Sequence, residues 1–110
     1  MSARPQVLVV FVTCANRAQA RRVSTHLIRR HLAACVNVIP QVESIFWWQG
    51  KVERARETLL IIKTTRQAFE RLRAEVVRLH SYDTPEIIAL PIARGHQPYL
   101  EWVRASTRQA

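Results

Sequence analysis

The segment from residue 34 to residue 64 constrains the fold more than any other part of the chain. Its apolar and β-branched residues predict two long β-strands. The turn between them is predicted at Gln49-Gly50, because glycine supplies the positive φ that short hairpin loops need. With a two-residue loop, Glu43 faces Arg56, which is a favourable cross-strand charge pair.

Pro40 complicates the register of this hairpin. Continued without interruption, the register places Ile39 opposite Leu60 and Val38 opposite Ile61. Proline has no N–H to donate to a ladder, so a bulge or a sheet edge is predicted at Pro40. The turn therefore does not by itself determine the register of the residues between Ala34 and Pro40.

The tip of the hairpin is apolar on both faces. Ile45 and Trp47 point to one face, and Phe46 and Trp48 to the other. Burying a tryptophan removes on the order of 200 Å² from water, worth up to roughly 5 kcal/mol at about 25 cal/mol/Å². A chain of 110 residues has little core to cover both faces, so a second copy is expected to cover the tip. The alternative is a curled hairpin whose own C-terminal helix covers one face.

Composition and length indicate a single globular domain over residues 1–110, with residues 1–5 and 106–110 expected to be flexible ends. Hydrophobic residues make up 48% of the chain and charged residues 23%. There is no apolar run long enough to span a membrane and no signal peptide pattern at the start. Two cysteines without C-x-x-C spacing make no disulfide framework, so a cytoplasmic location is expected.

The formal charge of +9 raises the question of nucleic acid. Two lysines leave fifteen arginines among the 17 basic residues. Many of these arginines fall on the polar sides of predicted amphipathic helices, where charge is expected in any case. No zinc finger, helix-turn-helix or RNP-like pattern accompanies them, so nucleic acid is not expected as a partner.

The remaining segments complete a β-α-β-β-α-β-α order. Strands are predicted at 7–13 and 86–92, and helices at 16–31, 65–80 and from Pro98 onward, with Tyr99, Trp102 and Val103 on one side of the last helix. Two βα units around a hairpin predict a ferredoxin-like split βαβ sandwich, that is, a four-stranded antiparallel sheet with two helices on one face and an extra C-terminal helix. Right-handed crossovers place the first strand beside the third and the fourth.

Short motifs spread along the chain resemble those of the CutA family, the proteins named for divalent-cation tolerance. The resemblance runs from about Val7 to Val103 and rests on Leu32-Ala-Ala-Cys-Val-Asn37, Trp48-Gln-Gly-Lys51 with Glu53 and Glu57, Ile62-Lys-Thr64, His80-Ser-Tyr82, Pro85-Glu-Ile-Ile88, Leu90-Pro-Ile92 and Tyr99-Leu-Glu-Trp102.

The resemblance implies a ferredoxin-like fold, a tight homotrimer related in architecture to nitrogen-regulatory PII proteins, and a cytoplasmic metal-tolerance protein that binds copper. In such a trimer, Ile45, Phe46, Trp47, Trp48 and Trp102 are expected at the subunit interface. One departure is Ser81, where the family commonly has proline, and it loosens the turn that aims His80 and Tyr82.

His80, Glu86 and Cys14 are the candidate metal ligands. Imidazole and carboxylate suit a divalent ion, and a thiolate would favour copper or zinc. The end of the first strand lies near the start of the fourth in the predicted fold, so the three side chains could converge. Each also has an ordinary structural role open to it: His80 as a helix-end cap, Glu86 as an ion-pair partner and Cys14 as a small buried residue.

Glu53 and Glu57 share a face of the third strand, and Lys63 and Tyr82 are expected near the same subunit boundary. These four residues predict either a small-ligand pocket of the kind that PII-like trimers place between subunits or an interfacial salt-bridge network. Nothing in the sequence supports a catalytic constellation or a phosphate-binding loop, so no enzyme activity is expected. The functions left open are divalent-cation tolerance, with copper preferred, and a trimeric signalling or scaffold module with an unidentified partner.

Overall fold

The computed structural model describes residues 4–108, which form four strands and three helices. In chain order these are β1 (Val7–Cys14), α1 (Arg17–Arg29), β2 (Cys35–Trp48), β3 (Lys51–Thr65), α2 (Arg66–Leu79), β4 (Ile87–Pro91) and α3 (Gln97–Ser106). The order matches the one predicted from the sequence. Helix α1 begins where the Asn16 side chain accepts a hydrogen bond from the Gln19 N–H at 2.9 Å.

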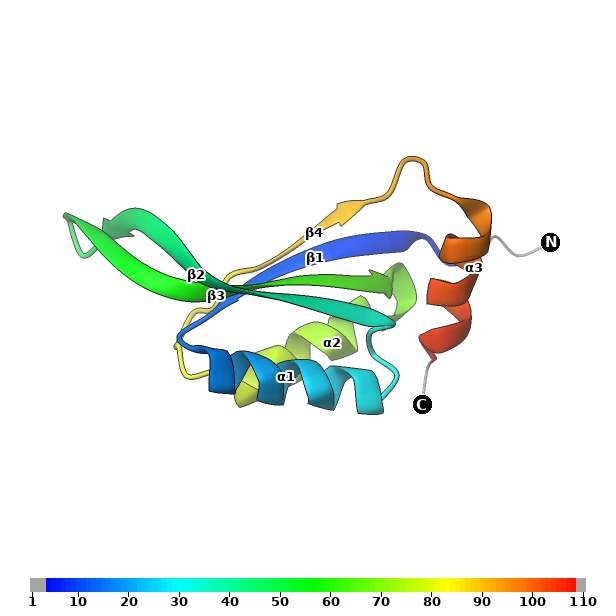
Figure 1. Cartoon of the computed structure of the whole chain (residues 1–110), viewed down its shortest axis with the longest axis horizontal. Coiled ribbons are helices and arrows are strands. Elements are labelled where there is room, and N and C mark those ends of the chain that lie inside the picture. The colour runs from blue at the N-terminus through cyan, green and yellow to red at the C-terminus, as the bar shows by residue number, and fades with distance from the viewer. Residues whose placement is uncertain (1–3, 109–110) are drawn as a thin grey trace.

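The strands form one antiparallel sheet in the order β2-β3-β1-β4. Helices α1 and α2 lie side by side on one face of this sheet, and α3 lies at one end of it (Figure 1). β1 therefore lies between β3 and β4, as the right-handed crossovers predicted. The ferredoxin-like split βαβ sandwich is confirmed.

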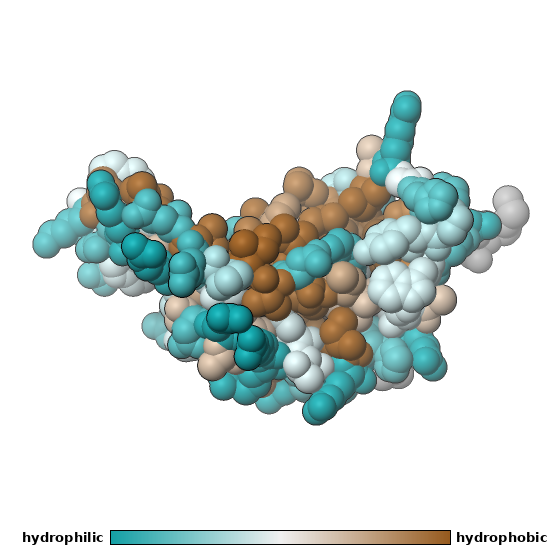
Figure 2. All heavy atoms as spheres, in the orientation of Figure 1, coloured by the Kyte–Doolittle hydropathy of each residue, from teal (hydrophilic) through white to brown (hydrophobic). Residues whose placement is uncertain are grey.

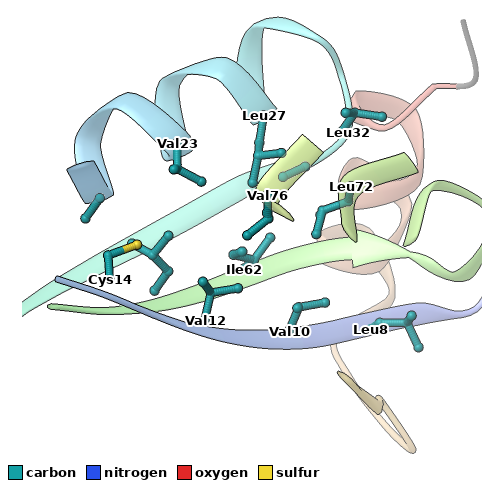
Figure 3. Packing of buried hydrophobic residues seen from close by; sticks show 13 residues of the cluster. Leu8, Val10, Val12, Cys14, Val23, Leu27, Leu32, Ile62, Leu72 and Val76 are labelled. Carbon is teal, nitrogen blue, oxygen red and sulfur yellow. The ribbon is translucent and has the colours of Figure 1, made fainter. Parts of the chain in front are cut away.

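The core lies between the sheet and the pair of helices. Val10 and Val12 on β1 and Ile62 on β3 point toward Leu27 of α1 and Val76 of α2, and all five side chains are fully buried (Figure 3). The apolar positions of each helix recur at spacings of three and four residues, which brings them onto the single face that packs on the sheet. Burial of this face holds both helices in place.

The turn of the hairpin has two residues, as predicted. Gln49 has φ 49° and Gly50 has φ 78°, the left-handed pair of a type I′ turn. Glu43 lies opposite Arg56, which confirms the predicted register near the tip. The predicted register beyond Pro40 is wrong by one residue, because a bulge between Ile39 and Val42 puts Ile39 opposite Leu59.

The β2–β3 hairpin extends well beyond the rest of the molecule (Figure 1). The molecule measures 51 × 26 × 21 Å, and its longest dimension is about the length of the 15 residues of β3 at roughly 3.3 Å per residue. The radius of gyration is 14.7 Å, above the roughly 13 Å of a compact chain of this size. The tip of the hairpin is thus removed from the chain's own core.

None of the helices in the described part of the chain covers the face of the sheet opposite α1 and α2, and we call it the open face. Hydrophobic side chains gather over the strands (Figure 2). On the open face, β1 contributes Phe11, which pairs with Ile61 of β3 and Ile88 of β4. Ile88 and Leu90 each keep 55% of their surface exposed. An apolar sheet face left uncovered is typical of a surface that another chain covers.

Helix α3 differs in part from its prediction. Its buried residues are Leu100 and Val103, which pack with Val7 at the start of β1. Tyr99 and Trp102 instead lie exposed on the outside, with ring centroids 5.6 Å apart. Because α3 lies at the end of the sheet away from the hairpin tip, it does not cover the tip, and the curled-hairpin alternative is wrong (Figure 1).

Both described ends of the chain are tied to the body. The Arg104 side chain donates to the Pro5 carbonyl at 2.7 Å, and the Arg108 N–H donates to the His31 carbonyl at 3.0 Å. Arg4 also pairs with Glu101. The flexible ends expected from the sequence otherwise fall on 1–3 and 109–110, outside the described residues. None of the helices within residues 4–108 is long and apolar enough to cross a membrane.

Candidate functional site

A cleft of about 770 Å³ lies between the hairpin and the loop that follows α2. The hairpin contributes one wall, and the end of β1 and the loop before β4 contribute the other. The lining residues are Thr13, Ser44, Ile45, Phe46, Trp48, Glu53, Arg54, Glu57, Tyr82, Asp83, Thr84 and Glu86. The walls thus combine carboxylates with apolar and aromatic side chains.

The charge of this cleft is opposite to that of the chain as a whole. The chain has 8 acidic residues and a net charge of +9, yet four of those acids, Glu53, Glu57, Asp83 and Glu86, line this one cleft. Arg54 is the basic residue among the lining side chains. Clustered carboxylates in a protein of this composition concentrate negative potential where the rest of the surface is positive. The cleft therefore favours cations.

Glu57 is the most buried acid of the cleft, with 8% of its surface exposed. The Tyr82 hydroxyl donates a hydrogen bond of 2.8 Å to its Oε2 atom. Burial, followed by this hydrogen bond, raises the pKa of Tyr82 to about 12. Burial, followed by the negative charge of Glu57, raises the pKa of the Cys14 thiol to about 11. Both neighbours of Glu57 are therefore neutral near pH 7.

His80 holds the loop that carries Tyr82. It follows the last residue of α2, and its ring is largely buried. Its Nε2 donates to the Thr13 carbonyl at 2.7 Å, and its Nδ1 accepts from the Tyr82 N–H at 3.0 Å. The rings of His80 and Tyr82 lie 4.7 Å apart. Both ring nitrogens of His80 are thus engaged within the chain, in spite of the serine at position 81.

The structure does not bring His80, Glu86 and Cys14 together as a set of metal ligands. Within residues 4–108, no group of three or more His, Cys, Asp and Glu side chains is arranged to hold a metal ion. Cys14 points into the core, its thiol is protonated and it is fully buried (Figure 3). Glu86 is exposed at the rim of the cleft. His80 is therefore engaged by hydrogen bonds within the chain, and Cys14 is engaged by packing in the core.

The predicted small-ligand residues separate into two places. Glu53, Glu57 and Tyr82 line the cleft together, as the shared strand face of the two glutamates indicated. Lys63 does not join them within one chain, because it lies six residues along β3 from Glu57, about 20 Å away at roughly 3.3 Å per residue. Lys63 hydrogen-bonds Asn37 instead, and its Nζ lies 3.9 Å from the Cys35 sulfur.

Asp83 and Arg54 belong to the cleft, and sequence reasoning missed both. From its sequence context, between a helix and Pro85, Asp83 is a typical turn residue. The sequence held one signal for Asp83. It lies with Glu86 in the loop after the second helix, and a split βαβ fold places that loop beside the end of the first strand. The sequence did not show that the hairpin would turn its acidic face toward this loop.

The residues predicted at a subunit interface are exposed in the single chain. Trp47 keeps 76% of its surface in solvent, Ile45 58%, Trp48 56% and Trp102 47%. Phe46 is also exposed, and Val52 opposite Trp47 is exposed as well. Within residues 4–108, no element covers these large apolar side chains on either face of the hairpin tip.

Fold and cleft together define a ferredoxin-like α/β protein with a long projecting hairpin and an acidic cleft beside it. Comparison with known proteins gives the family: the CutA1 divalent ion tolerance protein family matches residues 8–106. The chain belongs to this family.

Individual relatives agree with this assignment. The chain is 47% identical over 103 residues to the rice protein CutA 1, chloroplastic, covering 94% of this chain and 58% of the relative. It thus spans little more than half of that protein. It is 46% identical to the Divalent-cation tolerance protein CutA of Thermus thermophilus, covering 90% of this chain and 96% of the relative. The crystal structure of CutA1 from Oryza sativa superposes with a TM-score of 0.94 at 45% identity, covering 99% of this chain and 100% of the rice chain.

Proposed function

We propose that this protein binds divalent cations in the acidic cleft and contributes by this binding to divalent-cation tolerance. The observation that carries the proposal is Glu57. Its carboxylate is more than nine-tenths buried, its hydrogen-bond partner Tyr82 is neutral, and no ion pair within residues 4–108 involves it. A buried charge without a counter-charge is costly, and buried charges are ordinarily paired or coordinated to metals. A divalent cation would supply the missing charge.

The donor set decides which cations suit the cleft. Glu53, Glu57, Asp83 and Glu86 line the cleft with carboxylate oxygens, the ligand type that suits Mg²⁺, Ca²⁺ and Mn²⁺. Within residues 4–108 no three of these side chains converge on one point, so a cation in the cleft would be held by one or two carboxylates and by water. Copper, the metal predicted from the sequence, would instead draw on His80 and Cys14. For that, His80 must give up a hydrogen bond to Thr13 or Tyr82, and Cys14 must lose its proton. Copper binding through the thiol would therefore release a proton, whereas binding by the carboxylates alone would not.

Calorimetric titration of metal-free protein with Cu²⁺ and with Mn²⁺ tests the proposal. Glu57→Gln keeps the shape and removes the charge, and we expect it to weaken binding of both ions at least tenfold. Glu70→Gln is the matched control, because Glu70 is an exposed acid on α2 that pairs with Arg73 away from the cleft. Titration of Cu²⁺ in two buffers of different ionisation heat measures the proton release. Equal affinities of wild type and Glu57→Gln for both ions would refute the assignment of the cleft.

His80→Ala separates the two ligand sets. If copper uses His80, this variant weakens Cu²⁺ binding and leaves Mn²⁺ binding unchanged. Because His80 also holds the Tyr82 backbone, circular dichroism of the variant confirms that the loop change has not unfolded the protein. Unchanged Cu²⁺ binding in His80→Ala would remove His80 from the ligand set.

We further propose that the protein works as a homotrimer. The support lies in the uncovered open face, the exposed hairpin tip and the two sheet edges at β2 and β4, which a second copy could pair with or cover. Trp48 has 56% of its surface exposed, so covering it would bury about 110 Å² and stabilise the assembly by about 3 kcal/mol per copy. The number three comes from the family resemblance.

Light scattering at low micromolar protein tests the assembly. We expect a mass about three times the 12.8 kDa of the chain, and stability that rises with protein concentration. Trp48→Ala should lower both the trimer fraction and the stability. A folded species of 12.8 kDa at that concentration would refute the proposal.

A second candidate is a trimeric signalling or scaffold module that binds a small ligand at the same cleft. The size of the cleft favours it, because about 770 Å³ is typical of a small-molecule site and far exceeds one ion. Phe46 and Trp48 add aromatic faces beside the carboxylates, a combination that suits an organic cation. A native mass spectrum of protein purified without chelator would show whether the bound species is a metal or an organic molecule. The cytoplasmic location stays a prediction, since relatives include proteins named chloroplastic.

A further inference from the structure

The outward side of α1 carries an unbalanced positive charge. Arg17, Arg21, Arg22 and Arg29 are all exposed there, and neither Asp nor Glu occurs on the helix. A shallow hollow of about 470 Å³ runs along it, lined by Arg21, Arg22, Thr25, His26 and Arg29. We call these residues, with Arg17, the α1 basic surface.

Ion pairs within the same helix engage Arg73 and Arg78 of α2 and Arg104 of α3, whereas α1 has no acid of its own to pair with. Arg66 and Arg71 of α2 are, like the arginines of the α1 basic surface, in no ion pair within residues 4–108. On α2, Glu70 pairs with Arg73 and Glu75 with Arg78, and on α3, Glu101 pairs with Arg104, each three residues apart. Across residues 4–108, no ion pair involves any of the four arginines of the α1 basic surface. Glu75 of α2, the acid that contacts His26 of this surface, also pairs with Arg30 and Arg78.

This arrangement opposes the stability of α1. Arg17 lies in the first turn, at the positive end of the helix dipole, and that turn contains no acidic residue. Arg17 and Arg21 are like charges four residues apart, which destabilises a helix by about 0.2–0.5 kcal/mol. Helix α1 persists because Ala20, Val23 and Leu27 are fully buried against the sheet. The arginines on the outward side of α1 therefore do not stabilise the fold, and folding does not explain why they are there.

The chemistry of the surface narrows the partner. Guanidinium groups match phosphate oxygens in a bidentate geometry, and a Thr25 hydroxyl adds a further donor. The helix is about 20 Å long, which spans several consecutive phosphates of one strand of B-form DNA. Aromatic residues, on which single-stranded bases would stack, are absent from Arg17–Arg29, and the apolar side of α1 is buried and cannot enter a membrane.

We propose that the α1 basic surface binds the phosphate backbone of double-stranded nucleic acid without reading its sequence. The sequence alone did not favour this partner, because charge on the polar side of an amphipathic helix is common. The structure adds that these arginines form no ion pair with any residue from 4 to 108, share one surface and lie on the opposite side of the sheet from the open face. Assembly through the open face therefore leaves them accessible, and the inference is independent of cation binding in the cleft.

Fluorescence anisotropy with a labelled random-sequence duplex, titrated across a range of NaCl concentrations, tests the proposal. Arg21→Gln/Arg22→Gln removes two charges from the surface, and Arg56→Gln/Arg94→Gln removes two exposed charges elsewhere as a matched control. Each phosphate contact contributes about 0.9 to the slope of log affinity against log salt, so we expect the first variant to lose about 1.8 of that slope. The control should keep the wild-type slope. Circular dichroism and light scattering check that both variants fold and assemble alike.

Three results would overturn the proposal. One is no binding of wild type to the duplex at the lowest salt. Another is an equal loss in both variants, which would make net charge rather than this surface responsible. The third is selective binding of inorganic tripolyphosphate, of a single strand or of anionic phosphatidylserine vesicles without binding of the duplex, which would assign the arginines to a different anion.

Discussion

Protonation of Glu75 should remove a defined part of the protein's stability at acid pH. This carboxylate joins α1 to α2: its Oε1 lies 2.5 Å from His26 Nε2, and Arg78 donates to both of its oxygens at 2.9 and 3.0 Å. Arg30 of α1 lies 3.9 Å away. The hydrogen bonds from Arg78, and then from His26, lower the pKa of Glu75 from 4.5 to about 2.

The sign and the size follow from linkage. The pKa is depressed in the folded state, so the contribution is fully present above about pH 4.5 and is lost as the pH falls toward 2. A pKa difference of about 2.5 corresponds to about 3.4 kcal/mol at most. The Glu75 side chain keeps 21% of its surface in solvent, which screens these charges. We therefore expect a contribution of about 1–2 kcal/mol.

The contribution of ionised Glu75 to the free energy of unfolding can be measured by urea unfolding. Wild type and Glu75→Gln are compared at equal protein concentration and at pH values from 7 to 2. Glutamine resembles the protonated carboxyl in shape and charge. The difference in unfolding free energy should be about 1–2 kcal/mol at pH 7 and should approach zero near pH 2. Urea is preferred to guanidinium, because added salt would screen the charges.

Glu70→Gln is the control for this experiment. Glu70 pairs with Arg73 on the same helix, and its side chain is 74% exposed, so its loss should cost less than about 0.5 kcal/mol at any pH. The reasoning would be refuted by a Glu75→Gln protein as stable as wild type at pH 7, or by a difference that stays constant down to pH 2.

Three further predictions concern the core, the turn and the cleft. Leu27→Ala should lower the free energy of unfolding, measured by urea denaturation, by about 2–5 kcal/mol, because Leu27 is fully buried between α1 and the sheet. A loss below about 1 kcal/mol would contradict that packing. Gly50→Ala should cost about 1–2 kcal/mol in the same assay, since its φ of 78° disfavours a Cβ although nothing lies within 4 Å; an unchanged stability would exclude strain there. Ultraviolet titration should show Tyr82 ionising near pH 12. Glu57→Gln should lower the pKa of Tyr82 but leave it above the ordinary tyrosine value of 10, because burial is the largest cause of the shift. A pKa that the variant does not change would show that Glu57 does not act on Tyr82.

The order of elements followed from local features of the sequence. Apolar residues at spacings of three and four predicted α1 and α2, the Gln49-Gly50 pair predicted the turn, and chain connectivity with right-handed crossovers placed β1 at the centre of the sheet. Each of these depends on interactions between residues close in the chain or on rules general to all sheets. The structure and the family comparison confirm this part of the fold.

The register past Pro40 and the exposed side of α3 depended on tertiary packing. The sequence predicted a bulge or a sheet edge at Pro40, and the structure has a bulge between Ile39 and Val42. The sequence did not predict the resulting shift of one residue, which puts Ile39 opposite Leu59 rather than Leu60. Leu100 rather than Trp102 is buried, because Leu100 and Val103 are the residues of α3 that pack with Val7 at the start of β1. Sequence spacing alone does not distinguish neighbouring positions on one helix.

The site depended on tertiary structure most of all. The sequence by itself identified Glu53, Glu57 and Tyr82 as candidates, because their side chains carry the relevant chemistry. Only the folded chain decided that Cys14 turns into the core and that both ring nitrogens of His80 are already hydrogen-bonded. The physical reason is that a ligand site depends on distances between residues remote in sequence and on which polar atoms are already paired. Strand twist, the bulge and burial set those distances together, and none of them is a property of a single segment.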